Sequence, residues 1–216
     1  MTSRRPIIVW GASGHALVVA DILHLRNEFH ILGFLDDIDR QRKGKRFCNS
    51  TVLGGREQLD LLFSEGVRHF IIGIGDCAAR TRLAEIVKQK GFSLETAIHP
   101  QAVIASDAVL GAGTVISAGA VISPRVEIGE NVIVNTSASV DHECVIANGV
   151  HLSPGVRLSG RVTVGCGSWI GIGAIVKENI RIGANSIVGA GAVVLNDIPD
   201  NVVAYGSPAQ VIRRNQ

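Results

Sequence analysis

The stretch that decides the fold is residues 126–158, which read in threes as VEI-GEN-VIV-NTS-ASV-DHE-CVI-ANG-VHL-SPG-VRL. Every second triplet ends in an aliphatic residue, and the same pattern continues on both sides of this stretch. Sixteen aliphatic positions recur at a spacing of six with no exception: Ile104, Leu110, Ile116, Ile122, Ile128, Val134, Val140, Ile146, Leu152, Leu158, Val164, Ile170, Val176, Ile182, Val188 and Val194. Composition does not produce such a series, so the period is structural.

A six-residue period with small residues two places before each aliphatic position predicts a parallel β-helix. Each short strand points one aliphatic side chain into a narrow prism, where the neighbouring coils stack on it. Each such burial contributes about 1.5 to 3 kcal/mol, which makes the series the main stabilising term before chain entropy is subtracted. The region resembles the left-handed β-helix of hexapeptide-repeat acyltransferases, in which three consecutive hexads form one coil.

Residues 1–97 follow a different pattern, in which short β-branched runs alternate with helical ones. This pattern predicts βαβ units and a small Rossmann-like parallel sheet, so we expect an α/β domain over 1–97 and a β-helix domain with a C-terminal tail over 98–216. The predicted strands are 6–11, 29–37 and 68–76, the predicted helices are 15–26, 56–65 and 77–90, and 40–46 is predicted to be a polar loop.

Composition excludes several classes of protein. The chain of 216 residues is 46% hydrophobic, and its 21 Lys and Arg against 19 Asp and Glu leave a formal charge of +2, too balanced for a dedicated nucleic-acid binder. Four scattered cysteines without a CxxC pair suggest neither a disulfide framework nor a zinc site, so no metal is expected. No uninterrupted apolar run approaches the length of a membrane span, and glycines interrupt the run after Arg5, so we expect a soluble, cytoplasmic protein.

Residues three hexads apart should stack into three faces. The middle residues of the triplets point outward, and one face carries the apolar series Val115, Ile133, His151, Trp169 and Ile187. Such a stripe should not face water. We expect it to form an oligomer contact, and the resemblance to hexapeptide-repeat acyltransferases implies that the oligomer is a homotrimer; the alternative is that the N-terminal domain of the same chain covers it.

The corners between the faces differ in charge. One corner stacks most of the ionisable residues, and there His142 lies between Asp141 and Glu143. Histidine suits a general base near neutral pH, and an adjacent carboxylate can orient it; an exposed turn histidine is the alternative. His151 lies half a coil further on, so both histidines can reach one substrate only from different subunits.

Several motifs carry a narrower resemblance that covers the whole chain. They are GASGHA at 11–16, FLDD at 34–37, GIGD at 73–76, DHEC at 141–144 with the following His151, and GSPAQVIR at 206–213. Together they resemble the nucleotide-sugar acetyltransferases of the bacillosamine-pathway and sialic-acid O-acetyltransferase group. The resemblance implies a homotrimer of glycan biosynthesis with active sites between its subunits, and acetyl-CoA as co-substrate.

The resemblance also implies roles for individual residues in the β-helix. His142 would be the catalytic base, assisted by Glu143, and His151 would contact acetyl-CoA. The other matched cofactor positions are Asn135, Gly160, Ile172 and Ala190, to which Arg213 is added as a partner for a CoA phosphate. A solvated basic tail is the alternative for Arg213. Three of these positions, Asn135, Ile172 and Ala190, fall on a corner rich in small residues, whose backbone groups suit a thin pantetheine arm.

The N-terminal motif GASGHA has GxxG spacing and not GxGxxG, so it is a weak sign of a dinucleotide fold. Its glycines still allow phosphate to approach a helix N-terminus. By resemblance this is the nucleotide-sugar pocket. Ser13, Gly14 and His15 would lie near the diphosphate and sugar, and Asp36 and Asp37 near the base or ribose.

The expected reaction is therefore acetyl transfer from acetyl-CoA to the amine of a 4-amino-4,6-dideoxy sugar, with UDP as the first choice of nucleotide. GDP- or dTDP-linked amino sugars and O-acetylation of a sialic-acid-type sugar stay open. A γ-carbonic-anhydrase-like metalloenzyme lacks a third imidazole in the repeat, since only His142 and His151 lie there. An NAD-dependent oxidoreductase would leave the β-helix without use, and a non-catalytic trimeric scaffold would leave the two histidines without use.

Overall fold

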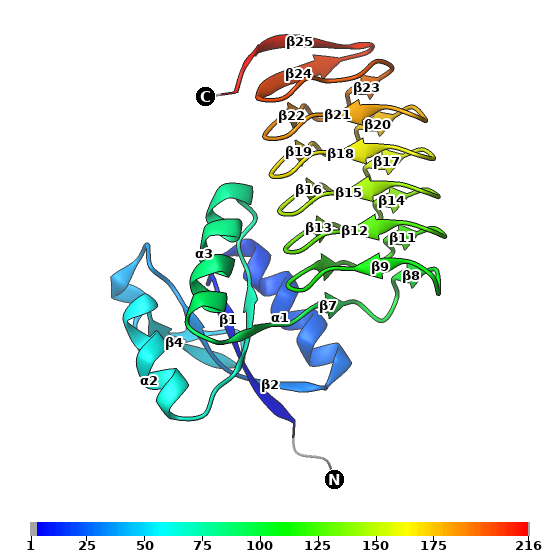
Figure 1. The fold of residues 1–216 in the computed structure, drawn as a ribbon. Coiled ribbons are helices and arrows are strands. Elements are labelled where there is room, and N and C mark those ends of the chain that lie inside the picture. The colour runs from blue at the N-terminus through cyan, green and yellow to red at the C-terminus, as the bar shows by residue number, and fades with distance from the viewer. Residues whose placement is uncertain (1–3, 216) are drawn as a thin grey trace. The chain divides into compact units, whose positions relative to one another are not determined.

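The computed structural model describes residues 4–215, which form two compact units: unit 1 ends at Pro100 and unit 2 begins at Gln101. Unit 1 is a six-stranded sheet in the order β3-β4-β2-β1-β5-β6, parallel except for the β3–β4 pair. Its elements, shown in Figure 1, are β1 Arg5–Trp10, α1 Gly14–Arg26, β2 Phe29–Leu35, β3 Arg46–Phe47, β4 Ser50–Gly54, α2 Leu59–Ser64, β5 His69–Ile72, α3 Cys77–Gln89, β6 Ser93–Leu94 and β7 Ala97–Ile98, with 3-10 turns at Arg40–Arg42 and Arg56–Gln58.

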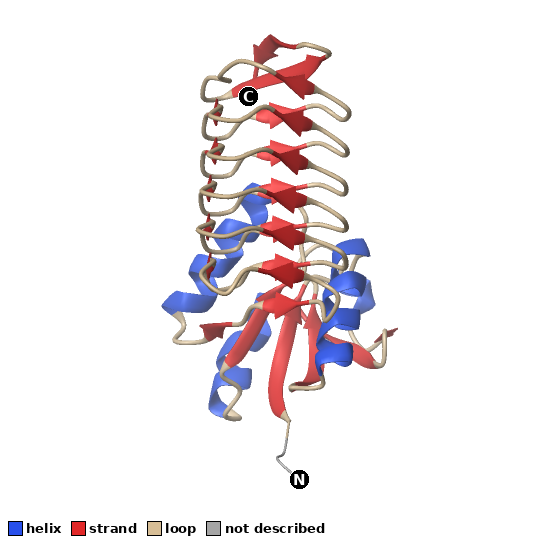
Figure 2. Ribbon diagram, turned by 90° about the vertical axis from the view of Figure 1, so that its right-hand side faces the viewer, coloured by secondary structure: helices blue, strands red, loops and turns tan. Residues whose placement is uncertain are grey.

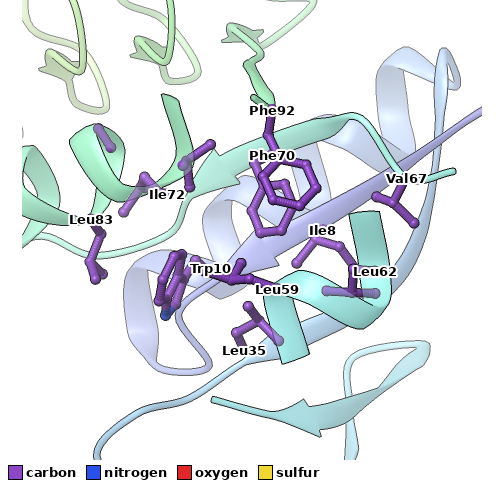
Figure 3. Close-up of a cluster of buried hydrophobic side chains, with 12 residues drawn as sticks. Ile8, Trp10, Leu35, Leu59, Leu62, Val67, Phe70, Ile72, Leu83 and Phe92 are labelled. Carbon is purple, nitrogen blue, oxygen red and sulfur yellow. The ribbon is translucent and has the colours of Figure 1, made fainter. Parts of the chain in front are cut away.

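The core of unit 1 shows why these segments form strands and helices. Alternate residues of β1 and β5, namely Ile8, Trp10, Phe70 and Ile72, face the same side of the sheet. As Figure 3 shows, α2 and α3 cover them with apolar side chains, among them Leu59, Leu62 and Leu83. The predicted Rossmann-like parallel sheet is confirmed. The strands β3 and β4 were missed, because no strand was predicted between the polar loop 40–46 and the helix expected to begin at residue 56.

Unit 2 is a β-helix of three parallel sheets (Figure 2). The first sheet contains β10 Val115–Ile116, β13 Ile133–Val134, β16 His151–Leu152, β19 Trp169–Ile170, β22 Ile187–Val188, β24 Val202–Gly206 and, antiparallel to β24, β25 Ala209–Arg214. The second contains β8 Val103–Ile104, β11 Val121–Ile122, β14 Ser139–Val140, β17 Arg157–Leu158, β20 Ile175–Val176 and β23 Val193–Val194. The third contains β9 Val109–Leu110, β12 Glu127–Ile128, β15 Val145–Ile146, β18 Thr163–Val164 and β21 Arg181–Ile182.

The register within each sheet confirms the hexapeptide prediction. Partners are separated by three hexads, as in the pairs Ile133 with His151 and His151 with Trp169. The aliphatic third residue of each triplet is buried from Ile116 onward. The first residue of the triplet is buried as well, which the aliphatic spacing did not predict.

Some of these first positions are polar and join successive coils. The thiol of Cys144 donates to the carbonyl of Ser159 at 3.2 Å and accepts the backbone N–H of Val162 at 3.4 Å. The hydroxyls of Thr114 and Ser168 make the same pair of bonds to the coil that follows them. A buried hydroxyl or thiol is acceptable here because it has a donor and an acceptor within reach.

The outward stripe of the first sheet is only partly accessible. Val115 and Ile133 are fully buried within the single chain and His151 is 7% exposed, whereas Trp169 is 38% exposed. The second sheet keeps exposed apolar side chains at Val103, Val121 and Ile175. The homotrimer and the placement of its contact on the first stripe stay predictions.

Candidate functional site

His142 lies in the turn that joins β14 to β15, on the edge between the second and third sheets. Its backbone N–H donates to Oδ1 of Asp141 at 2.8 Å, which fixes the start of the turn. Its Nδ1 lies 3.1 Å from Oε2 of Glu143. Because an ionised carboxylate only accepts, Nδ1 carries the proton and Nε2 keeps a lone pair. The side chain is half-exposed, so this lone pair can reach a ligand.

Glu143 is flanked by arginines from the coils below and above. Arg125 Nη1 lies 3.1 Å from its Oε1 and Arg161 Nη1 3.6 Å from its Oε2. The hydrogen bond from His142 holds the pKa of Glu143 below its ordinary value, and the two guanidinium groups add to that effect. Glu143 therefore stays ionised near neutral pH, which suits a group that orients an imidazole and stabilises its protonated form.

Gly160 lies one coil above His142 and touches its ring. A Cβ on Gly160 would lie 2.6 Å from both Cε1 and Nε2 of His142. Its N–H makes no hydrogen bond to any described residue, although Asn179 donates to its carbonyl. The sequence grouped Gly160 with the cofactor contacts, and the structure places it against the predicted base.

A second feature, which we call the His151 groove, lies along the first sheet and the corner that joins it to the second. Its volume is about 460 Å³, and its lining is Asn135, His151, Ser153, Pro154, Trp169, Gly171, Ile172, Ile187, Val188, Gly189 and Ala190. Four of the predicted cofactor contacts, Asn135, His151, Ile172 and Ala190, thus come together in one groove.

Two of the predicted cofactor contacts lie outside this groove. Gly160 is on the His142 edge, and Arg213 is on β25, where its Nη1 donates to the carbonyl of Arg214. Within one chain the His142 edge lies opposite the first sheet, which carries His151. As predicted from the repeat, one chain does not bring the two histidines together.

The predicted nucleotide-sugar residues gather at the carboxyl ends of the strands of unit 1. Ser13, Gly14 and His15 follow β1 at the start of α1, and Asp36 and Asp37 follow β2. In a parallel sheet this edge is where ligands bind. The GASGHA motif meets the GIGD motif here, since a Cβ on Gly11 would lie 2.5 Å from the carbonyl oxygen of Gly73.

The two aspartates are held inside the chain. Asp37 accepts the backbone N–H of Arg56 at 2.7 Å and pairs with its guanidinium at 2.9 Å. Asp36 accepts the N–H groups of Ile38 and Asp39, and pairs with Arg42 at 3.2 Å. Arg42 also donates to the carbonyl of Ala12 in the GASGHA loop. The contacts that the structure shows for Asp36 and Asp37 hold the surrounding loops together. Their roles toward a base or ribose stay predictions.

Sequence reasoning missed several residues of both sites. Arg125 and Arg161 lie one coil before and one coil after Glu143, and this spacing was a sufficient signal to pair them with it. Arg42 lay in a segment predicted as loop and Arg56 at the start of a predicted helix, with no repeat to align them to Asp36 and Asp37. The contact of Trp169 with His151 could also have been predicted from the sequence, because the two residues occupy the same position in consecutive coils.

No group of three or more His, Cys, Asp or Glu side chains is placed to hold a metal ion in the described range 4–215. Within the same residues, no helix has the length and apolar character needed to cross a bilayer. All four cysteines are free, with Cys77 and Cys144 buried and Cys48 and Cys166 exposed.

Comparison with known proteins places these features in context. Residues 6–87 match the family model described as PglD N-terminal domain, and residues 161–196 match the one described as bacterial transferase hexapeptide (six repeats). No curated protein sequence matches the chain.

Solved structures match over nearly the whole chain. A mutant of perosamine N-acetyltransferase from Caulobacter crescentus, in complex with CoA and GDP-perosamine, is 36% identical with a TM-score of 0.91, and 96% of each chain is covered. The acetyltransferase domain of PglB from Neisseria gonorrhoeae FA1090, in complex with acetyl coenzyme A, is 34% identical with a TM-score of 0.90, covering 97% of this chain and 100% of that one. WeeI from Acinetobacter baumannii AYE is 25% identical with a TM-score of 0.88, covering 96% and 100%.

Proposed function

Because the chain belongs to the PglD-like family of hexapeptide-repeat nucleotide-amino-sugar N-acetyltransferases, we propose that it acetylates the amine of a nucleotide-linked 4-amino-4,6-dideoxy sugar, with His142 as the general base. The chain is an acyltransferase that uses acetyl-CoA and a nucleotide-linked amino sugar, which confirms the class expected from its motifs. To this class of reaction the proposal adds the identity of the catalytic base, of the acceptor sugar and of its nucleotide.

One observation carries the proposal: the His142–Glu143 pair leaves the Nε2 lone pair of His142 available on an exposed edge. In the proposed step the sugar amine attacks the thioester carbonyl carbon, so a C–N bond forms and the C–S bond breaks. Nε2 of His142 takes the proton of the amine and passes it to the departing sulfur of CoA. A base placed in this way contributes about 10² to 10⁴ in rate.

The backbone N–H of Gly160 supports the same step. It is a donor beside the His142 ring, and it makes no hydrogen bond to any residue in the described part of the chain. A donor aimed at the oxygen of the tetrahedral intermediate stabilises the charge that develops there. Gly160 would thus act with the base and not along the pantetheine arm.

We place acetyl-CoA in the His151 groove and the nucleotide at the edge that carries Ser13, Gly14 and His15. Because the His142 edge and the His151 groove lie on separate sides of the β-helix, the reacting groups meet only if copies of the chain assemble. A homotrimer with active sites between subunits meets this need, and Arg213 would pair with a CoA phosphate.

UDP is the first choice of nucleotide. The similarity to an enzyme solved with GDP-perosamine makes GDP the second candidate. Thiol release from acetyl-CoA, measured with UDP-, GDP- and dTDP-linked 4-amino sugars and a sialic-acid-type acceptor, separates these choices.

The test of the base uses His142→Ala beside a matched control, His24→Ala, an exposed histidine of α1. His142→Ala should lose at least about 10²-fold in kcat while remaining folded and keeping its affinity for CoA. The control should keep full activity. Turnover of His142→Ala at the rate of the control would reject the assigned base.

A further inference from the structure

Trp169 and His151 form a stacked pair in the lining of the His151 groove. They occupy the same position in consecutive coils, on β19 and β16, and are paired in register. Their ring centroids are 5.0 Å apart and the planes differ by 13°. The parallel arrangement follows from the β-helix, since equivalent side chains of adjacent coils lie directly above one another.

The indole of Trp169 is fixed although the residue is 38% exposed. Its Nε1–H donates to Oγ of Ser153 at 2.7 Å, a bond that spans two adjacent coils. The stack on His151 and this hydrogen bond together hold the ring in one orientation. An exposed aromatic face that is already immobilised gains affinity for a ligand at little entropic cost.

His151 is fixed from its other side by Asn135. The backbone N–H of Thr136 donates to Oδ1 of Asn135 at 2.8 Å, which determines the orientation of the amide. Its Nδ2 then lies 3.3 Å from Nε2 of His151 and donates to it. The proton of the imidazole is therefore on Nδ1, and Nε2 is not available as a base. This is the reverse of His142, whose Nε2 is available.

We propose that Trp169 is a positioning residue for the acyl donor: its locked indole fixes the plane of His151 and forms the apolar wall against which the pantetheine arm lies. Ile187 occupies the position of Trp169 in the next coil. Gly171 follows Trp169 by two positions and Gly189 follows Ile187 by two, so backbone without side chains lies beside the apolar wall. Ile172, which is 62% exposed, adds apolar surface beyond them. The inference rests on the proposed function, because it takes the groove to be the acetyl-CoA site.

The experiment measures the binding of CoA to the whole chain by calorimetry. No sugar is present and no acetyl group is transferred, so the measurement does not depend on the sugar or on catalysis by His142. Trp169→Leu removes the ring, Trp169→Phe keeps the ring without the Nε1–H, and Ser153→Ala removes only the partner of that N–H. We expect CoA to bind about tenfold more weakly to Trp169→Leu, and within about threefold of wild type to Trp169→Phe and Ser153→Ala. Leu25→Ala, at an exposed position on α1, is the matched control and should not change binding.

Steady-state kinetics give a second readout that a merely structural role would not produce. In Trp169→Leu the KM for acetyl-CoA should rise about tenfold, while the KM for the nucleotide sugar stays within about twofold. Equal CoA affinity in wild type and Trp169→Leu would overturn the inference and leave the proposed function standing. A rise of both KM values together would also overturn it.

A wild-type protein that binds no CoA would instead overturn the proposed function itself, so the two failures are distinguishable. Tryptophan fluorescence tests whether CoA binds next to Trp169. The chain has two tryptophans, Trp10 and Trp169, so the emission of Trp169 can be followed alone once Trp10 is replaced. In a Trp10→Phe background, CoA should change the emission of Trp169 with the dissociation constant that calorimetry gives for the same variant. Emission that stays constant while CoA binds would overturn the placement of the arm against the indole.

Discussion

The imidazole ring of His142 rests against the Cα of Gly160, with no room for a methyl group between them. We predict that Gly160→Ala displaces the ring and lowers kcat by about 10- to 100-fold, because a proton acceptor must be held within hydrogen-bond reach of the amine. Affinity for CoA should be unchanged. In a His142→Ala background the same substitution should have no further effect on kcat; an additional loss there would show that Gly160 acts by another route.

Glu143 provides a prediction about pH. Its pKa is lowered in the folded chain, first by the hydrogen bond from His142, so its ionised form stabilises the fold above the ordinary carboxyl range. This contribution is lost as the pH falls through the lowered pKa. Glu143→Gln should thus lower the Tm at neutral pH, and its difference from wild type should shrink to zero in acid.

Thermal unfolding followed over a pH series checks the behaviour of Glu143→Gln. Glu178→Gln, an exposed carboxyl position on the same edge, is the control and should show no comparable pH-dependent difference. A Glu143→Gln difference that persists unchanged at the acid end would contradict the ion-pair account.

Cys144 belongs to the DHEC motif, yet its thiol has a structural role. Burial raises the pKa of Cys144 to about 11, so it is not a thiolate at neutral pH. We predict that Cys144→Ser retains full activity, since a serine hydroxyl makes the same two bonds at Ser168. In native protein at pH 8, a thiol reagent followed by mass spectrometry should label Cys48 and Cys166 but not Cys144. Rapid labelling of Cys144, or an acetyl group found on it during turnover, would contradict this assignment.

Two glycines of the GASGHA motif should respond differently to alanine. Gly11 has a φ of +131° and faces the carbonyl of Gly73 at a distance that no Cβ tolerates, so Gly11→Ala should lower the Tm. Gly14 has open space around its Cα, so Gly14→Ala should leave the Tm within about 2 °C of wild type. It should still weaken nucleotide binding about tenfold if a phosphate approaches this backbone. Unchanged nucleotide affinity in Gly14→Ala would remove the diphosphate from the start of α1.

The β-helix could be predicted almost completely because its sequence repeats one pattern many times. The exceptions were the first triplet positions, where polar residues such as Thr114 and Ser168 are buried. Their burial depends on a donor and an acceptor in the next coil, which spacing alone does not reveal. In unit 1 the strands β3 and β4 were missed, because two short strands beside a polar loop carry little periodic signal and depend on pairing with β2.

The site was predictable at the level of register and not at the level of rotamers. The three-hexad spacing correctly separated the corner of His142 from the groove of His151. It could not show that the ring of His142 leans onto Gly160, nor that Ser153 orients Trp169. Those contacts depend on side-chain torsions, which the repeat leaves free.

The placement of His142 and the His151 groove on separate sides of the β-helix has a genetic consequence. In the proposed homotrimer each copy would contribute its base to one neighbour and its groove to another, so two defective alleles would restore what neither provides alone. Co-expressed chains, one with His142→Ala and one with a damaged groove, would form hybrid assemblies in which some interfaces join two intact halves. Recessive defects in this protein should therefore complement each other in pairs, according to the side of the β-helix on which each defect lies.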